Sequence, residues 1–231
     1  MRKNYLPGRS NVLATNGIAA TSQPLSSLEA ISILKKGGNA IDAAIAASAV
    51  QSVIEPGSTG VGGDCFALIS LNDQKPISVN GSGISPKKAS LEFFEKNNIK
   101  EIGLLSPHSV TIPGAIHAWY SMHQKYGKLD FEELFITAEN YSRNGYPVHE
   151  VAAKTWDKNI NKIVKNESTK KIFSKNGKAY QFGEIHKNLD LANTLKSIAK
   201  NGIHDFYNGY IAEDIVSSLN SIGGCHSVDD F

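Results

Sequence analysis

The sequence predicts a mixed α/β domain, and two observations lead to this class. Residues 37–71 (GGNAIDAAIAASAVQSVIEPGSTGVGGDCFALISL) show in order an alanine-rich helix, a glycine-rich loop and an apolar strand. After residue 86 the pattern turns mostly helical, with apolar residues recurring at helical spacing. No internal repeat or low-complexity linker divides the 231 residues, so we predict a single domain over residues 1–231.

The composition is typical of a globular protein, with 41% hydrophobic and 20% charged residues. A net charge of +2, without lysine and arginine clusters interleaved with aromatics, argues against nucleic-acid binding. No apolar run has the length needed to cross a bilayer, and the N-terminal residues lack the apolar core of a secretory signal. Cys65 and Cys225 lie far apart, which indicates free thiols in a reducing compartment. We therefore predict a cytoplasmic protein that binds neither nucleic acid nor membrane.

The chain is predicted to open with a strand pair over residues 12–20, joined by a tight Asn-Gly turn. A helix then runs from a cap at Ser26 or Ser27 to Leu34, and a glycine pair ends it. The first third of the chain therefore leads from paired strands into helix.

The central helix is predicted over residues 40–53 and has a strong N-terminal signal. Asn39 can cap its first turn, and the negative charge of Asp42 suits the positive end of the helix dipole. Its many alanines leave little side chain on any face, so neighbouring elements can approach its backbone closely. Pro56 ends the helix, because the residue before a proline is disfavoured in helical conformation.

A hairpin is predicted from residues 65–71 and 76–79, with its turn at Asn72-Asp73. Its first strand is apolar on both faces, which indicates a position inside a sheet. Asp130 begins a capping-box pattern for one of the later helices, and residues 166–183 form a polar, lysine-rich segment that predicts an exposed excursion. The later helices are predicted over residues 90–96, 114–125, 130–143, 149–164, 189–200 and 209–221.

The glycine-rich loop, residues 57–63 (GSTGVGG), superficially resembles a phosphate-binding loop. Such a loop needs a strand before it and a helix after it, so that the phosphate meets a helix N-terminus. Here a helix precedes the loop and a strand follows it, and no Gly-Lys-Ser/Thr is present. We predict a tight structural loop whose amides can line a site, and no nucleotide cofactor.

Four hydroxyls lie in glycine-rich or turn settings, but none sits in the GxSxG pattern of a nucleophile elbow. Two carboxylates flank the glycine loop, and anchoring of the loop is the favoured interpretation for both. The hydroxyls are those of Ser58, Thr59, Ser82 and Thr111, and the carboxylates are those of Glu55 and Asp64.

The histidines show neither HxxxH nor HExxH spacing, so the sequence offers no metal-ligand motif. His226 with Asp229 and Asp230 is the one cluster worth weighing, and we favour a solvated polar end over a metal site. We predict no metal and no cofactor. Composition and spacing alone thus indicate an α/β enzyme-like domain without a mechanism.

Residues 22–66 resemble the opening of the γ-glutamyltranspeptidase family, whose pattern there is a Pro-Leu helix start, GGNA-(I/V)-DAA, a (V/I)-EP turn and a G-(I/V)-GG loop. The resemblance covers almost the whole chain and is highly specific. It continues through the segments VTIPG at 110–114, KYG at 125–127, residues 138–147, LDLA at 189–192 and DFYNG at 205–209.

The resemblance implies the αββα sandwich of N-terminal-nucleophile hydrolases, of which this chain would hold an incomplete, N-terminal portion of the large subunit. Such enzymes cut themselves into two subunits and expose a threonine, whose hydroxyl is the nucleophile and whose amine serves as base. That threonine and the oxyanion glycines would lie beyond Phe231. The last element also starts at Gly223 and stops without a capping signal, which suggests a fragment. We assign no catalytic residue, expect the C-terminal part or small subunit as partner, and expect this polypeptide alone to be inactive.

One departure from the family pattern bears on specificity. Typical transpeptidases carry an Arg-Glu-x-x-Pro segment whose arginine binds the substrate α-carboxylate. Aligned on Pro86, this chain has Ser82 in the arginine position. The preceding NGSG form is similar to a cytoplasmic, acylase-like branch whose members often carry an arginine at the position of Ile84. We predict Ser82 as a substrate-binding residue that supplies a neutral hydrogen bond; the alternative is that it only shapes a turn.

Three functions follow from this resemblance. The first is a γ-glutamyltransferase or hydrolase that acts on glutathione-like γ-glutamyl amides through a threonine acyl-enzyme. The second is an acylase with a different acyl group, which the missing arginine favours. The third is a catalytically inactive structural or binding relative. A threonine in a processing motif downstream of Phe231 would distinguish the enzymes from the third.

Overall fold

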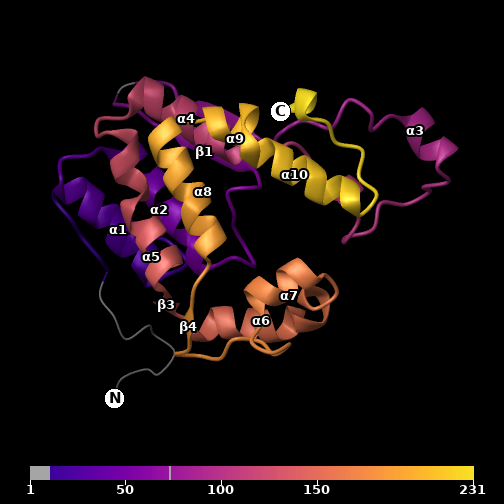
Figure 1. The fold of residues 1–231 in the computed structure, drawn as a ribbon. Helices are drawn as coiled ribbons and strands as arrows, with labels where there is room; N and C mark the ends of the chain where they lie inside the picture. Colours follow the sequence, from indigo (N-terminus) through magenta and orange to yellow (C-terminus); the bar gives the residue numbers. More distant parts are fainter. Residues whose placement is uncertain (1–10, 73) are drawn as a thin grey trace, which may run out of the picture.

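The computed structural model describes residues 11–72 and 74–231. Two predictions fall outside the described part: the absence of a secretory signal concerns residues 1–10, and the predicted hairpin turn includes Asp73. Figure 1 shows a body of packed helices from which two excursions extend, one carrying α6 (Glu150–Ile163) and α7 (Glu167–Phe173) and the other carrying α3 (Leu91–Lys96). Within the described residues, no helix has both the length and the apolar character that crossing a membrane would require.

The first helix, α1 (Pro24–Lys35), begins earlier than predicted. Pro24 occupies the first turn, where its missing N–H leaves nothing unpaired, and the side chain of Gln23 caps the helix by accepting from the Leu25 N–H. Ser26, a predicted cap, is instead fully buried, and its hydroxyl donates to the Ala47 carbonyl at 2.7 Å. The cap prediction was therefore wrong, because tertiary packing against the next helix claims this serine.

The central helix α2 (Ala40–Ile54) confirms the predicted cap. The Asn39 side chain accepts from the N–H groups of Ile41 and Asp42, and Asp42 accepts from the Asn39 N–H at 2.8 Å. Asp42 is fully buried and also accepts from the Lys128 N–H at 3.0 Å. Most of the helix is buried between α1, α5 (Ile136–Asn144), the 3₁₀ helix Phe131–Phe135 and α4 (Ala115–Tyr126), as its alanine content predicted.

The predicted hairpin is confirmed, with β1 (Cys65–Ile69) antiparallel to β2 (Ile77–Gly81). Alternate residues of β1 turn toward the core, whereas Phe66 is 64% exposed and Leu68 is 81% exposed. The strand was predicted to lie inside a sheet, but among the described residues it pairs with β2 alone and only one of its faces is covered. Residues 12–20, predicted to be paired strands, form no strand, because they pair with no other strand among the described residues.

The predicted later helices are present with small shifts at their ends, and two short helices that were not predicted, α7 (Glu167–Phe173) and α9 (His204–Asn208), lie among them. The helix predicted from Asp130 starts as a 3₁₀ helix, Phe131–Phe135, and Asp130 makes no side-chain cap, so the predicted capping box is absent. Gly145 ends α5 at a φ of 98°. The helices are α3 (Leu91–Lys96), α4 (Ala115–Tyr126), α5 (Ile136–Asn144), α6 (Glu150–Ile163), α7 (Glu167–Phe173), α8 (Leu189–Asn201), α9 (His204–Asn208) and α10 (Tyr210–Ser221).

The α6–α7 excursion leaves and rejoins the body through a short strand pair, β3 (Tyr146–Pro147) with β4 (Ile185–His186). The polar segment 166–183 was predicted to be an exposed excursion, and most of its residues are exposed or half-buried. Its first part is helical, however, because Asn166 caps α7.

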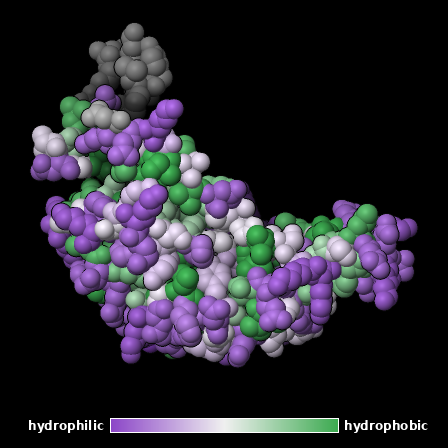
Figure 2. Space-filling view, turned by 90° about the horizontal axis from the view of Figure 1, so that it is seen from above, coloured by the Kyte–Doolittle hydropathy of each residue, from purple (hydrophilic) through white to green (hydrophobic). Residues whose placement is uncertain are grey.

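The second excursion, residues 84–110, extends away from the body around α3 (Figures 1 and 2). The last residues of the chain hold it: His226 Nε2 lies 2.8 Å from the Val110 carbonyl, and Asp230 accepts from the Lys87 N–H at 3.0 Å. His226 and Asp230 are buried. The predicted solvated polar end is therefore wrong for these two residues, which instead form buried contacts with the two ends of the second excursion.

Candidate functional site

Ser82, the predicted substrate-binding residue, lies directly after β2 on an exposed turn. Its N–H donates to Asn80 Oδ1 at 3.0 Å, and its carbonyl accepts from the Thr111 hydroxyl at 3.3 Å. The Ser82 hydroxyl itself makes only a long contact of 3.4 Å with the Gly83 carbonyl. The backbone of the turn is thus held on both sides, while the hydroxyl keeps its capacity to bind a substrate group.

Two glycines fix this turn against the start of α4. Gly83 has a φ of 78°, and a Cβ atom there would lie 1.9 Å from the Ile112 carbonyl oxygen. A Cβ on Gly114 would lie 2.2 Å from the Gly81 carbonyl oxygen. Only glycine fits such approaches, so the Ser82 turn is built by backbone contact rather than by side chains.

The glycine loop also contacts the N-terminus of α4, against which the Ser82 turn packs. The Gly63 carbonyl accepts from the N–H groups of both Gly114 and Ala115 at 3.0 Å. At its other end, the N–H groups of Ser58 and Thr59 donate to the Glu55 carbonyl. The structure therefore agrees with a tight structural loop, and it brings the loop, the Ser82 turn and the α4 N-terminus together.

A cavity of 610 Å³ opens along the glycine loop. Part of its wall is apolar, from Trp119 and Phe66, and the rest is loop backbone and small polar side chains. Cys65 also lines it, but burial raises the pKa of its thiol and the Asp64 charge raises it further. The thiol is protonated at neutral pH and is a poor nucleophile.

The described residues offer no arginine to the Ser82 turn. Arg143 is the one arginine among them, and it lies on α5 with its guanidinium 3.0 Å from Glu139 and 3.1 Å from the Asn193 amide oxygen. Ile84 is 62% exposed and only its carbonyl is engaged, by the Ile112 N–H. The turn therefore presents a neutral surface, as the sequence alone indicates.

Small residues of α2 form the floor of two further cavities. One of 640 Å³ lies toward residues 16–21, and one of 410 Å³ lies toward β1. Ala40 and Ala44 are exposed between them. We call this surface of α2, between residues 16–21 and β1, the α2 channel. The residues that both cavities share are Asn39, Ala40, Ala44 and Ser48.

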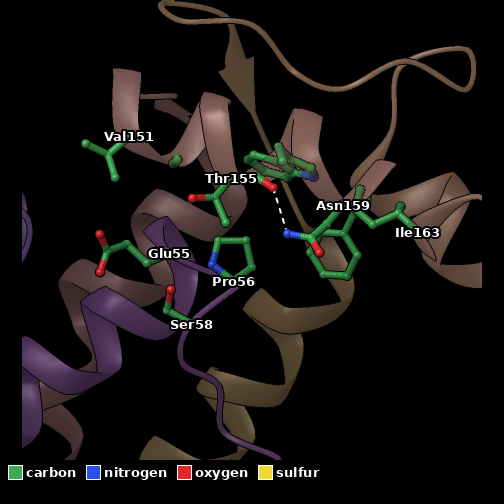
Figure 3. Close-up of a pocket in the computed structure, with 11 residues that line it drawn as sticks. Glu55, Pro56, Ser58, Val151, Thr155, Asn159 and Ile163 are labelled. Atoms are coloured by element: carbon green, nitrogen blue, oxygen red, sulfur yellow. Dashed lines mark hydrogen bonds between the residues drawn. The ribbon is translucent and has the colours of Figure 1, made fainter. Parts of the chain in front are cut away.

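A further cavity lies between the Glu55–Ser58 segment and α6 (Figure 3). Sequence reasoning missed it, although two of its residues, Ser58 and Glu55, had been weighed for other roles. The signal available was the apolar spacing of Ala152, Trp156 and Ile163 along one face of α6. That spacing shows a buried face, but it does not show that the face would leave a space.

Comparison with known proteins identifies the relatives of this chain. The gamma-glutamyltranspeptidase family model matches residues 26–231. The glutathione hydrolase-like YwrD proenzyme of Bacillus subtilis is 36% identical over 223 residues, which cover 96% of this chain and 42% of that protein. Glutathione hydrolase 3 of Arabidopsis thaliana is 31% identical over 95% of this chain and 34% of its own length. The chain thus spans less than half the length of these relatives.

Solved structures agree with this result. Helicobacter pylori gamma-glutamyltranspeptidase superposes with a TM-score of 0.90 at 30% identity, over 96% of this chain and 64% of that one. The cephalosporin acylase from Bacillus halodurans gives a TM-score of 0.89 at 34% identity, over 100% of this chain and 44% of that one. The predicted fold class is confirmed, as is the family inferred from residues 22–66. The chain belongs to the γ-glutamyltranspeptidase family.

Proposed function

We propose that the protein is a hydrolase or transferase of γ-glutamyl amides such as glutathione, and that its nucleophile lies outside residues 1–231. The names of its relatives support this: both the Bacillus and the Arabidopsis proteins are called glutathione hydrolases or hydrolase-like. In the proposed reaction, a threonine hydroxyl attacks the γ-carbonyl carbon while its own α-amine takes the proton. The amine product leaves, and water or another amine then takes the acyl group from the threonine.

The observation that carries the proposal is the convergence of the glycine loop, the Ser82 turn and the α4 N-terminus. Ser82 stands where the family resemblance places the carboxylate-binding arginine, on a turn whose backbone is held by Asn80 and Thr111. Its hydroxyl donates to the substrate α-carboxylate. A hydrogen bond of this kind is weaker than a bidentate arginine contact, so we expect a high KM for γ-glutamyl substrates.

We also propose that the C-terminal part of the protein lies in the α2 channel and against the outer face of β1. Ala40, Ala44, Phe66 and Leu68 are exposed there, and the last two are large apolar side chains. Burial of this surface favours association. The Bacillus subtilis relative is more than twice as long as the region matched here, so a protein of that length has enough further chain for such a segment.

The test uses the complete processed protein and a pair of matched substrates, γ-glutamyl anilide and its analogue without the α-carboxylate, 4-aminobutanoyl anilide. We expect Ser82→Ala to raise KM for the γ-glutamyl substrate about 3- to 10-fold, the equivalent of one hydrogen bond, and to leave the analogue unchanged. Ser82→Thr keeps the hydroxyl and is the control. Equal effects on both substrates would show that Ser82 only shapes the turn.

The neutral Ser82 turn favours a second candidate, an acylase with another acyl group. Neither Ser82 nor Ile84 carries a charge, and the structurally similar cephalosporin acylase is 34% identical. This candidate predicts faster hydrolysis of simple acyl anilides than of γ-glutamyl anilide. A preference for γ-glutamyl anilide in the wild-type protein would rule it out.

A further inference from the structure

The cavity beside α6 measures 210 Å³ and adjoins the cavity along the glycine loop, with which it shares the lining residues Pro56, Gly57 and Ser58. It lies between the segment that follows α2 and one face of α6, and α7 closes one side (Figure 3). Its volume is below the roughly 300 Å³ at which pockets for drug-sized ligands begin, so it suits a smaller molecule. Its lining residues are Glu55, Pro56, Gly57, Ser58, Val151, Ala152, Thr155, Trp156, Asn159, Ile163 and Phe173.

One half of the cavity is apolar and aromatic. The ring of Trp156 is buried, and the ring centroid of Phe173 lies 6.3 Å from it. Ile163 and Pro56 complete this half. Such a wall accepts the ring or branched chain of a ligand, because apolar and aromatic side chains supply most of the contact area in small-molecule sites.

The other half carries oxygen atoms with unused capacity. Among the lining side chains, Figure 3 shows one hydrogen bond, from the Asn159 amide to the Thr155 carbonyl, at 2.8 Å. The Thr155 and Ser58 hydroxyls have no partner among these residues. Both hydroxyls lie on the same side of the Asn159 amide as the Glu55 carboxylate.

Glu55 keeps one carboxylate oxygen available. Its Oε2 accepts from the Ser22 hydroxyl and from the Gln51 amide at 3.0 Å. Its Oε1 lies 3.6 Å from His149 Nε2, which is too long for a hydrogen bond. Ser22 and Gln51 thus position Oε2, whereas Oε1, which faces His149 Nε2, makes no hydrogen bond among the described residues.

The charge of the lining selects the ligand. Glu55 is the one charged residue among the described residues that line the cavity, and no lysine or arginine is among them. We propose that this cavity binds a small primary amine with an aromatic or branched apolar body. The ammonium group donates to Glu55 Oε1 and to the Thr155 and Ser58 hydroxyls, and the body packs on Trp156. This inference is independent of the proposed function.

The test compares three probes that share a phenyl ring and differ in charge: benzylamine is a cation, benzyl alcohol is neutral and benzoate is an anion. Residues 1–231 contain two tryptophans, Trp156 and Trp119, whose indole N–H signals are identified in the ¹⁵N spectrum of the complete protein by replacing each in turn. Trp119 lies in other cavities and serves as an internal reference. With the complete protein, we expect benzylamine to shift the Trp156 signal alone. We expect benzyl alcohol to bind at least tenfold more weakly and benzoate to cause no shift.

Two substitutions test the polar contacts separately. Glu55→Gln removes the charge and keeps an acceptor for Ser22, and Thr155→Val removes a hydroxyl on a half-buried position of α6. We expect benzylamine to bind at least tenfold more weakly to the first and about threefold more weakly to the second. Glu150→Gln, an exposed carboxylate on the same helix, is the matched control. Equal binding of all three probes, or unchanged binding in Glu55→Gln, would overturn the proposal.

Discussion

Two regions of this molecule are packed in opposite ways. The centre, formed by α2 and the elements around it, uses small residues, and the Ser26 hydroxyl of α1 reaches the Ala47 carbonyl of α2 at 2.7 Å. The α6–α7 excursion instead gathers large rings around His186, with centroids at 5.0 Å from Trp156 and 4.8 Å from Tyr180. The centre is therefore held by close backbone approach and buried hydrogen bonds, and the excursion by aromatic side chains.

The difference explains where each region can carry a site. Close backbone packing leaves little space inside the centre, so its functional surface is the open channel over α2 and the glycine-fixed Ser82 turn. Large side chains on α6 and α7 cannot fill every space between them and the body, and a cavity remains beside Trp156. The predictions that follow remove the feature on which each region depends.

The largest effect is expected for Trp156→Ala in the excursion. Removing this buried ring leaves a cavity among aromatic neighbours, and we expect a loss of about 3–5 kcal/mol in the free energy of unfolding. Hydrogen exchange should become faster in α6 and α7 and change little in α2. Equal acceleration in α2 would contradict the view that the two regions are stabilised separately.

A loss of about 3 kcal/mol is expected for Asp42→Ala in the centre. The buried carboxylate accepts from the N–H groups of Asn39 and Lys128, and alanine leaves both donors without this partner. Chemical denaturation measures the change. Asp157→Ala, on the exposed side of α6, is the control and should change stability by less than about 0.5 kcal/mol. A small effect at Asp42 would show that water replaces the carboxylate.

The smallest effect is a pH dependence confined to the excursion. Burial lowers the pKa of His186, although its contact with the Ile172 carbonyl opposes this shift. Above about pH 6.5 the imidazole is neutral in both folded and unfolded protein, so stability is complete there. Below that pH the unfolded chain takes up a proton that the folded chain resists, and stability falls by up to about 1.4 kcal/mol per pH unit.

His186→Phe keeps an aromatic ring and removes this titration. We therefore expect the stability difference between His186→Phe and the wild type to shift in favour of the variant as the pH falls from 7.5 to 5.5. Thermal or denaturant unfolding at several pH values measures it. Parallel pH profiles for the two proteins would show that His186 is protonated in the folded state.

Local signals made the centre predictable from sequence. Asn39 with Asp42 marks the start of α2, and the apolar run after the glycine loop marks the first strand of the hairpin, because both depend on neighbours in sequence. Ser26 misled the prediction, since its partner Ala47 belongs to another helix. The burial of His226 and Asp230 was also not predicted, because their hydrogen-bond partners lie more than 100 residues away in sequence.

The sites were predictable only in part. The family pattern pointed to Ser82, but not to the glycine contacts that hold its turn, since these join three segments distant in sequence. The cavity beside α6 could not be predicted, because its walls come from the segment after α2, from α6 and from α7 together. The single domain, the cytoplasmic location and the role of Ser82 stay predictions.

The central claim is that this chain supplies binding surfaces and not the nucleophile of a γ-glutamyltranspeptidase-family enzyme. The direct measurement is aniline release from γ-glutamyl anilide by residues 1–231 alone and by the complete processed protein. We predict release by the complete protein only, with the acyl group trapped on a residue outside 1–231. Release by residues 1–231 alone would contradict the claim.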